Sequence, residues 1–158
     1  MTDFLIRPFE PRDSPSLTAV FMDSVRGGGA RDYQPAQVEV WARAAPTPQQ
    51  FEGRAQAGDL IWVAVDGRDK PLAYGVLERD GHLDHLYCRS DHIGMGLGSA
   101  LCDRLEQEAR ALGLTHLFTE ASEAARRLFL HKAFVLAYRR DFVLSGVAIH
   151  NYRMEKGF

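Results

Sequence analysis

The stretch His92-Ile93-Gly94-Met95-Gly96-Leu97-Gly98-Ser99 places three glycines in alternation with apolar residues. It follows an apolar, strand-like run over residues 82–89 and precedes a helix-like pattern over residues 100–112. A glycine-rich turn between a strand and a helix exposes backbone N–H groups, and the N-terminus of the helix adds partial positive charge. The stretch therefore predicts a phosphate site, and a cofactor that carries a pyrophosphate is the expected ligand.

The length and composition predict a single globular domain over residues 1–158. Hydrophobic residues make up 46% and charged residues 25%, and the net charge of −2 argues against a general nucleic-acid binder. Cys88 and Cys102 form no CxxC pair, which indicates a reducing compartment and gives no metal-ligand spacing. We see no secretory signal and no apolar run long enough to cross a bilayer. We therefore expect a cytoplasmic protein without nucleic-acid or membrane partners.

Hydrophobic periodicity predicts the order strand, two helices, three strands, helix, strand, helix, two strands. In the first half, a strand over 4–7 precedes a helix from Ser14 that the Gly27–Gly29 triplet should end as a flexible connection. A second helix starts near Pro35, with a short addition over 49–56. The remaining elements are strands over 60–65, 71–78 and 82–88, a helix over 99–112, a strand over 116–119, a helix over 122–132, and strands over 134–144 and 147–154. This order is typical of an α/β (α+β) domain, a mixed sheet with helices on its faces.

Two common phosphate-binding motifs do not fit the position of the glycine turn. A dinucleotide-binding βαβ unit has its turn after the first strand and an acidic residue about twenty positions later, whereas three further strands precede the turn here. A nucleotide-binding P-loop needs Gly-Lys-Ser/Thr, and no lysine follows Gly96 or Gly98. An unrelated nucleotide-binding domain is therefore a weak alternative.

The segment Gly96–Leu101, the run Glu120–Ser122 followed by Phe129 and Phe134, and the tail over 146–156 together resemble the GNAT superfamily of acyl-CoA-dependent N-acyltransferases. The tail is similar to that of small bacterial members of unassigned substrate. The resemblance implies a central, mostly antiparallel mixed sheet with helices on both faces. It also implies acetyl-CoA as cosubstrate and acetyl transfer to a small-molecule or protein amine. Ile93 stands where the family's loop carries Gln or Arg.

The resemblance also implies where acetyl-CoA binds. The strand before the loop splays from the strand after it, the pantetheine pairs with the free edge, and a backbone amide near Leu86 faces the forming oxyanion. The cofactor-binding residues implied in this way are Leu86, Tyr87, Cys88, Ile93, Gly94, Met95, Gly96, Leu97, Gly98, Ser99, Ser122 and Phe129.

His82 and Asp84 are the candidate catalytic residues. They lie two positions apart on one strand and so share a face. In relatives with known bases, carboxylates or histidines occupy these positions. We expect His82 to act as general base, because its reference pKa is near neutral, and Asp84 to orient it or bind the cationic amine. The alternative is that both are surface residues beside the Asp80-Gly81 turn. His85 points to the other face, so His82-x-x-His85 predicts no metal site.

Five further positions bear on the reaction. Phe129 stands where relatives carry a tyrosine that protonates the leaving thiolate, so either water or one of Tyr87, Tyr138 and Tyr152 replaces it. Tyr33 and Trp41 either line the acceptor pocket or belong to the core. Glu120 either binds the substrate amine or caps the following helix, and Cys88 is expected to pack as a small apolar residue.

Two broader expectations remain. Ile93 and Phe129 keep open an alternative function, a catalytically impaired CoA-binding or sensory module. The edge of the final hairpin offers a surface for pairing with a second copy, so a homodimer is a further expectation.

Overall fold

The computed structural model describes residues 3–158. The first half contains β1 (Leu5–Pro8), α1 (Ser14–Gly28), α2 (Pro35–Ala42), α3 (Pro48–Gln56), β2 (Leu60–Val65), β3 (Pro71–Leu77) and β4 (Leu83–Cys88). The second half contains α4 (Leu97–Ala111), β5 (His116–Ala121), α5 (Glu123–His131), β6 (Val135–Leu144) and β7 (Val147–Gly157). Short 3-10 turns cover Pro11–Asp13, Gly29–Arg31 and Ser90–His92. The predicted order of strands and helices is confirmed.

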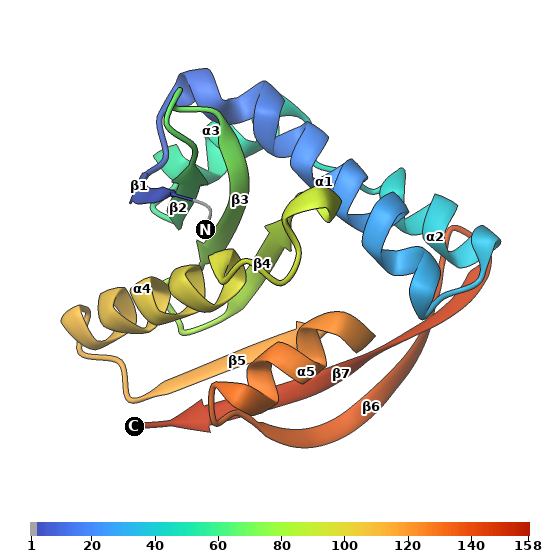
Figure 1. The fold of residues 1–158 in the computed structure, drawn as a ribbon. Helices are drawn as coiled ribbons and strands as arrows, with labels where there is room; N and C mark the ends of the chain where they lie inside the picture. The colour runs from blue at the N-terminus through green and yellow to red at the C-terminus, as the bar shows by residue number, and fades with distance from the viewer. Residues whose placement is uncertain (1–2) are drawn as a thin grey trace.

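The strands form two antiparallel sheets rather than one continuous sheet. The first has the order β1-β2-β3-β4 and the second the order β5-β7-β6. They meet at a parallel bridge between His82 and Phe118, beside which Phe118 donates its amide to the Gly81 carbonyl at 3.0 Å. Beyond the bridge β4 and β5 lie side by side and diverge (Figure 1). This divergence creates the space for a site between them.

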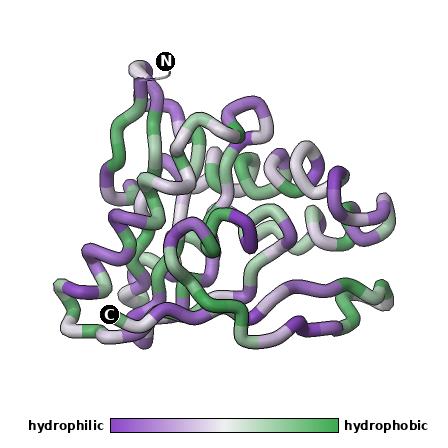
Figure 2. Tube along the Cα trace, turned by 60° about the horizontal axis from the view of Figure 1, so that its bottom comes forward, coloured by the Kyte–Doolittle hydropathy of each residue, from purple (hydrophilic) through white to green (hydrophobic). Residues whose placement is uncertain are grey.

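Helices α1 and α4 pack against the first sheet. Leu97, Leu101, Leu105 and Ala109 form the buried stripe of α4, and each is at most 1% exposed. In Figure 2 hydrophobic and hydrophilic segments alternate along the peripheral helices, as expected for amphipathic helices. A Cβ on Gly75 of β3 would lie 2.6 Å from Leu105 Cδ1, so α4 approaches the strand backbone closely. Each buried leucine contributes about 1.5–3 kcal/mol to this packing.

Helix α1 ends within the glycine triplet, as predicted, but the triplet is not a flexible connection. The helix continues through Gly27 and Gly28, and Gly29 begins a 3-10 turn. The reason is a close approach of another segment, because a Cβ on Gly27 would lie 2.3 Å from Ser90 Cβ. Packing therefore requires glycine at position 27, and the triplet forms a helix end and the start of a 3-10 turn rather than the flexible connection expected from the sequence.

The second sheet is covered by α5 on one side. Phe129 and Phe134 pack at 4.8 Å between ring centroids and share a core cluster with Tyr152 and Met154. Strand β6 forms an edge of this sheet, with Val135 and Val143 each 69% exposed. Pairing of two copies through this edge stays a prediction.

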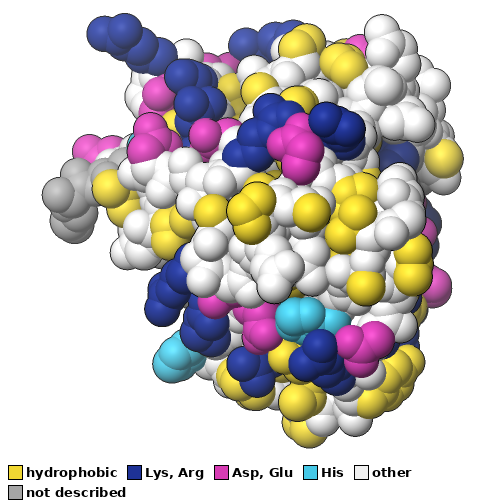
Figure 3. Space-filling view, turned by 90° about the vertical axis from the view of Figure 1, so that its right-hand side faces the viewer, with side chains coloured by type: hydrophobic (Ala, Val, Ile, Leu, Met, Phe, Trp, Pro, Cys, Tyr) yellow, Lys and Arg dark blue, Asp and Glu magenta, His cyan; other side chains and the backbone are white. Residues whose placement is uncertain are grey.

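The outer surface carries a mixture of charges. Figure 3 shows basic and acidic side chains interspersed on the face turned toward the viewer. Within residues 3–158, none of the helices has the length and apolarity needed to cross a membrane.

Candidate active site

The glycine-rich loop presents backbone amides at the start of α4. Gly94 and Gly96 have φ values of +83° and +85°, a left-handed region that favours glycine. Ala100 donates to the Gly96 carbonyl at 3.0 Å, which begins the hydrogen-bond ladder of the helix. The amides of Leu97, Gly98 and Ser99 precede that bond and belong to the helix positions that lack an intrahelical acceptor. Together with the helix dipole they form an anion-binding geometry.

Contacts with α1 fix the beginning of this loop. Asp23 Oδ2 accepts hydrogen bonds from the Ser90 amide at 2.8 Å and from Ser90 Oγ at 3.1 Å. The close approach of Gly27 to Ser90 lets the helix and the loop touch. Sequence reasoning missed this anchor, although the glycine triplet carried a signal for a close backbone approach.

A groove of about 330 Å³ runs along the loop. Its walls come from the end of α1, from β4, from the loop and from α5. Ten of the predicted cofactor-binding residues line it: Leu86, Tyr87, Cys88, Ile93, Gly94, Gly96, Leu97, Gly98, Ser99 and Ser122. The other two are placed differently, because Phe129 lines a neighbouring cavity and Met95 lies on the outside of the loop with 45% exposure.

A second cavity, of about 100 Å³, opens where β4 and β5 diverge. Asp84 faces it from β4, and Thr119 and Glu120 face it from β5. Its far wall is formed by Phe142, Leu144, Ile149 and His150 of the β6–β7 hairpin. The cavity and the groove share Tyr33, Trp41, Leu86, Tyr87, Ser122 and Ala125, so the two are continuous.

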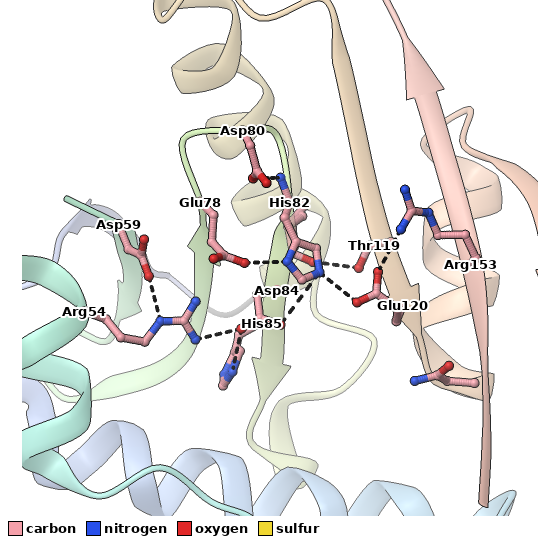
Figure 4. A network of polar contacts seen from close by, with 12 residues as sticks. Arg54, Asp59, Glu78, Asp80, His82, Asp84, His85, Thr119, Glu120 and Arg153 are labelled. Carbon is pink, nitrogen blue, oxygen red and sulfur yellow. Dashed lines mark hydrogen bonds and ion pairs between the residues drawn. The ribbon is translucent and has the colours of Figure 1, made fainter. Parts of the chain in front are cut away.

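His82 lies behind the acidic wall of this cavity, between two carboxylates (Figure 4). Its Nε2 hydrogen-bonds Glu120 Oε1 at 2.8 Å, and its Nδ1 contacts Glu78 Oε1. The bond to Glu120 raises the pKa of His82 to about 9, against the opposing effect of burial. The imidazole is therefore protonated at neutral pH and donates from both nitrogens. His82 also stacks on Phe118 at 4.8 Å between ring centroids, which fixes the plane of its ring.

Asp84 shares the His82 face of β4, as the alternation predicts. Its Oδ1 lies 3.8 Å from His82 Nε2, and its Oδ2 accepts a hydrogen bond from Arg54 Nη1 at 2.7 Å. Burial alone would raise the pKa of Asp84, but the charges of His85 and Arg54 and the Arg54 hydrogen bond lower it. Asp84 is thus an ionised carboxylate on the cavity wall.

His85 points away from His82 into the core below α1. Its Nδ1 is 2.9 Å from the Tyr74 hydroxyl, and burial lowers its pKa to about 4. The two histidines do not form a metal pair. One ligand atom each from Glu78, His82 and Asp84 lies within 4.8 Å of the others, but both ring nitrogens of His82 already contact carboxylates.

Three charged residues of this network were missed from the sequence: Arg54, Glu78 and Arg153. Glu78 and His82 are four positions apart across the Asp80-Gly81 turn, a spacing that could have indicated their pairing. Arg54 comes from α3, and Arg153 from β7, where its Nη1 lies 3.5 Å from Glu120 Oε2. No local pattern indicates contacts between such distant segments.

Of the tyrosines weighed as proton donors, Tyr87 alone lines the cavity and the groove. Tyr138 is 56% exposed on β6, and the Tyr152 hydroxyl donates to Glu123 Oε2 at 3.0 Å. Burial raises the pKa of Tyr87, so its hydroxyl keeps its proton. Burial also raises the pKa of the half-buried Cys88 thiol to about 11, which disfavours a thiolate there.

Tyr33 and Ser122 hold the junction between the cavity and the groove. The Tyr33 hydroxyl donates to the His150 carbonyl at 3.1 Å and accepts from the Glu123 amide at 3.1 Å. Ser122 caps α5 by accepting from the Ala125 amide at 3.3 Å, so Glu120 is not the capping residue. Tyr33 and Trp41 contact each other edge to face at 5.4 Å between ring centroids.

The fold and these cavities define an acyltransferase scaffold, and the family model of the acetyltransferase (GNAT) domain matches residues 29–156. The chain belongs to this family of acyltransferase enzymes. An L-methionine sulfoximine/L-methionine sulfone acetyltransferase of Pseudomonas paraeruginosa is 31% identical, with 89% of this chain and 81% of the relative covered.

Solved structures show the same fold. A GCN5-related N-acetyltransferase of Rhodopseudomonas palustris superposes with a TM-score of 0.90 and 30% identity over 100% of this chain and 98% of that one. The PaiA N-acetyltransferase of Thermoplasma acidophilum, in complex with coenzyme A, gives a TM-score of 0.77 at 18% identity over 99% of both chains.

Proposed function

We propose that this protein transfers an acetyl group from acetyl-CoA to a primary amine by direct attack within a ternary complex. The observation that carries the proposal is the continuity between a groove that begins at the phosphate-binding loop and a cavity walled by Asp84 and Glu120. A thioester placed in the groove meets an amine placed in the cavity. Holding both reactants in line removes much of the entropic barrier, up to several kcal/mol.

In this proposal the loop binds the diphosphate through main-chain amides, with Leu97, Gly98 and Ser99 as donors. Isoleucine at position 93 then lowers the affinity for the diphosphate only slightly, because the phosphate ligands are backbone groups rather than the side chain at that position. The pantetheine lies along Leu86, Tyr87 and Cys88 of β4, where β5 has parted from the strand. A main-chain amide near Leu86 faces the carbonyl oxygen as negative charge develops.

The proton acceptor in the proposal is the His82–Glu120 pair. Glu120 faces the cavity and His82 lies directly behind it at 2.8 Å. A proton leaving the amine reaches Glu120 and passes to Nε2 of His82 when the imidazole is neutral. With a pKa of about 9, the His82 imidazolium is similar in acidity to an alkylammonium ion. The free-energy change of proton transfer from the ammonium to His82 is therefore small. Asp84 binds the ammonium before the proton leaves.

Tyr87 is the proposed donor to the departing CoA thiolate. Phe129 has no hydroxyl, and among the residues that line both hollows Tyr87 and Tyr33 carry phenols. The Tyr33 hydroxyl already donates to a main-chain carbonyl. Tyr87 therefore replaces the missing tyrosine and passes a proton to the thiolate while it takes up another from water in the same step, because burial disfavours a tyrosinate.

Release of free thiol from acetyl-CoA tests this function when it is followed with a panel of primary amines and the acetylated product is identified by mass spectrometry. The proposal predicts thiol release that depends on the amine, with one acetylated amine for each CoA. Calorimetric binding of CoA without turnover on any amine would instead support the CoA-binding module.

A further inference from the structure

We infer that the acceptor is a cationic amine without a carboxylate, the kind of molecule formed by decarboxylation of an amino acid, rather than an α-amino acid. The inference rests on the proposed function and concerns the charges around the cavity between β4 and β5. It separates this chain from the relative named for methionine sulfoximine and methionine sulfone, both of which carry an α-carboxylate.

The ionic side chains that face the cavity are acidic. Among the described residues that line it, Asp84 and Glu120 carry formal negative charge. His150 is the remaining titratable imidazole on the wall, and its Nε2 lies 3.0 Å from Glu123 Oε2, a carboxylate outside the cavity. A bound ammonium is attracted by this wall, whereas a carboxylate beside it meets like charge.

The nearby cations lie behind that wall and are paired with its carboxylates and with further partners. Protonated His82 bonds Glu120 at 2.8 Å and also contacts Glu78. Arg54 binds Asp59 at 2.7 Å as well as Asp84, and Arg140 binds Asn151 Oδ1 at 3.2 Å. Arg153 contacts Glu155 at 3.3 Å and Glu120 at 3.5 Å. A substrate carboxylate would have to break one of these pairs to obtain a cationic partner, which leaves an uncompensated carboxylate of the protein.

One carboxylate oxygen beside the cavity has no hydrogen-bond donor among the described residues. Glu120 Oε2 is buried and accepts no hydrogen bond from the described residues, although Arg153 Nη1 lies 3.5 Å away. A buried acceptor without a donor is costly, so a ligand N–H that reaches it gains affinity. An ammonium ion has three donors in a compact group and satisfies this oxygen, while Asp84 compensates its charge.

Much of the remaining lining is aromatic and aliphatic, with His150 and Asn151 beside it. Trp41, Tyr33 and Phe142 line the same cavity as the carboxylates, together with Leu144 and Ile149. Aromatic faces attract cations and bury hydrocarbon, so they favour an alkyl or aryl chain attached to the ammonium. These side chains offer no paired donors of the kind that hold a carboxylate. The ligand chemistry that fits both parts of the lining is an ammonium group on an apolar carbon chain.

Matched pairs of amine and parent amino acid test the inference: phenethylamine with phenylalanine, isoamylamine with leucine, putrescine with ornithine, and L-methionine sulfoximine as a further amino acid. Binding to the protein–CoA complex is measured by calorimetry, and kcat/KM by thiol release. We expect at least one amine to bind at least tenfold more tightly than its amino acid and to show a similar preference in kcat/KM. Equal binding within every pair, tighter binding of the amino acids, or binding of neither class would overturn the inference.

Variants separate this outcome from a failure of the proposed function. Glu120→Gln and Asp84→Asn should each weaken amine binding by tenfold or more and reduce the discrimination against the amino acid. Asp141→Asn removes the same charge from a position on β6 that is paired with Arg139, and its binding should match the wild type. A preference for the amines without acetyl transfer would retain this inference and contradict the enzymatic proposal, whereas acetyl transfer to amino acids would do the reverse.

Discussion

Glu120 of β5 accepts a hydrogen bond at 2.8 Å from the imidazole of His82, across the point where the two sheets separate. His82 belongs to the bridge that still pairs the two sheets, whereas Glu120 already lines the cavity that opens beyond it. It also sets the charge of both partners, because it raises the pKa of His82 and lowers that of Glu120. The same contact thus stabilises the junction and places a proton-accepting pair beside the cavity.

The pH dependence of acetyl transfer should report this pair. With the His82 pKa at about 9, kcat/KM rises with pH through pH 7, reaches half of its limiting value near pH 9 and levels off above it. His82→Gln should lower kcat/KM by about 10²–10⁴-fold at pH 8. Glu120→Gln removes the largest cause of the raised pKa, so the inflection should move to lower pH.

The ionisation of the free amine is present in all three profiles and serves as the internal reference. A profile for His82→Gln that coincides with the wild type after scaling for protein concentration would remove His82 from the proton transfer.

The stability of the fold should depend on pH through His82 as well. The pKa of this residue is raised from 6.5 to about 9 on folding, so its contribution is complete below pH 6.5 and is lost as the pH rises through 9. The contribution is on the order of 3 kcal/mol. Urea unfolding of wild type and His82→Gln should therefore differ more at pH 6 than at pH 10. A difference that grows with pH would contradict the assigned charge state.

The left-handed conformation of Gly96 should be required for cofactor binding. A Cβ at Gly96 meets no atom within 4 Å, so Gly96→Ala adds strain at φ +85° without a steric clash. We expect a loss of about 1–2 kcal/mol and weaker binding of CoA, as the loop relaxes and its amides turn away. Calorimetry with CoA measures the affinity, and thermal unfolding measures the stability.

Gly53→Ala is the matched control for that substitution. Gly53 also has open space around its Cβ position, but it lies within α3 at negative φ. This variant should be neutral or more stable by about 0.5–1 kcal/mol, with unchanged CoA affinity. Equal effects of the two variants would show that the loop conformation is not special.

Removal of the Tyr87 hydroxyl should slow release of the thiolate. Tyr87→Phe keeps the ring that packs on Phe21 at 4.5 Å between centroids, so the core should tolerate the change. We expect kcat to fall by about 10–100-fold with little change in the KM for acetyl-CoA. Tyr152→Phe is the control, because its hydroxyl binds Glu123 outside both hollows. An unchanged kcat for Tyr87→Phe would assign thiolate protonation to water.

Much of this architecture could be predicted from local sequence signals. The glycine turn, the hairpin turns and the helical stripe of α4 each depend on neighbours in the chain, and their positions are confirmed within a few residues. The splay between β4 and β5 was implied by the family resemblance rather than by periodicity, and the division of the strands into two sheets was not predicted. Strand periodicity does not specify which strands pair, so it could not show that β4 and β5 meet only near His82 and Phe118.

The charged network was only partly predictable. His82 and Asp84 were identified because they alternate on one strand, and Glu120 because it precedes the cap of α5. The environment of His82 depends on Glu78 and Glu120, and that of Asp84 on Arg54 from α3. These contacts join segments up to 38 residues apart. The raised pKa of His82 therefore follows from tertiary placement, and the near-neutral reference value was a poor guide.

A single-turnover experiment tests the central claim most directly. The protein is loaded with acetyl-CoA, mixed with an amine, and analysed by intact-protein mass spectrometry together with thiol release. Direct attack predicts that CoA appears only after the amine is added, at the rate at which the acetylated amine forms, with no acetylated protein. Release of CoA before the amine arrives, with the acetyl group retained on the protein, would contradict the account.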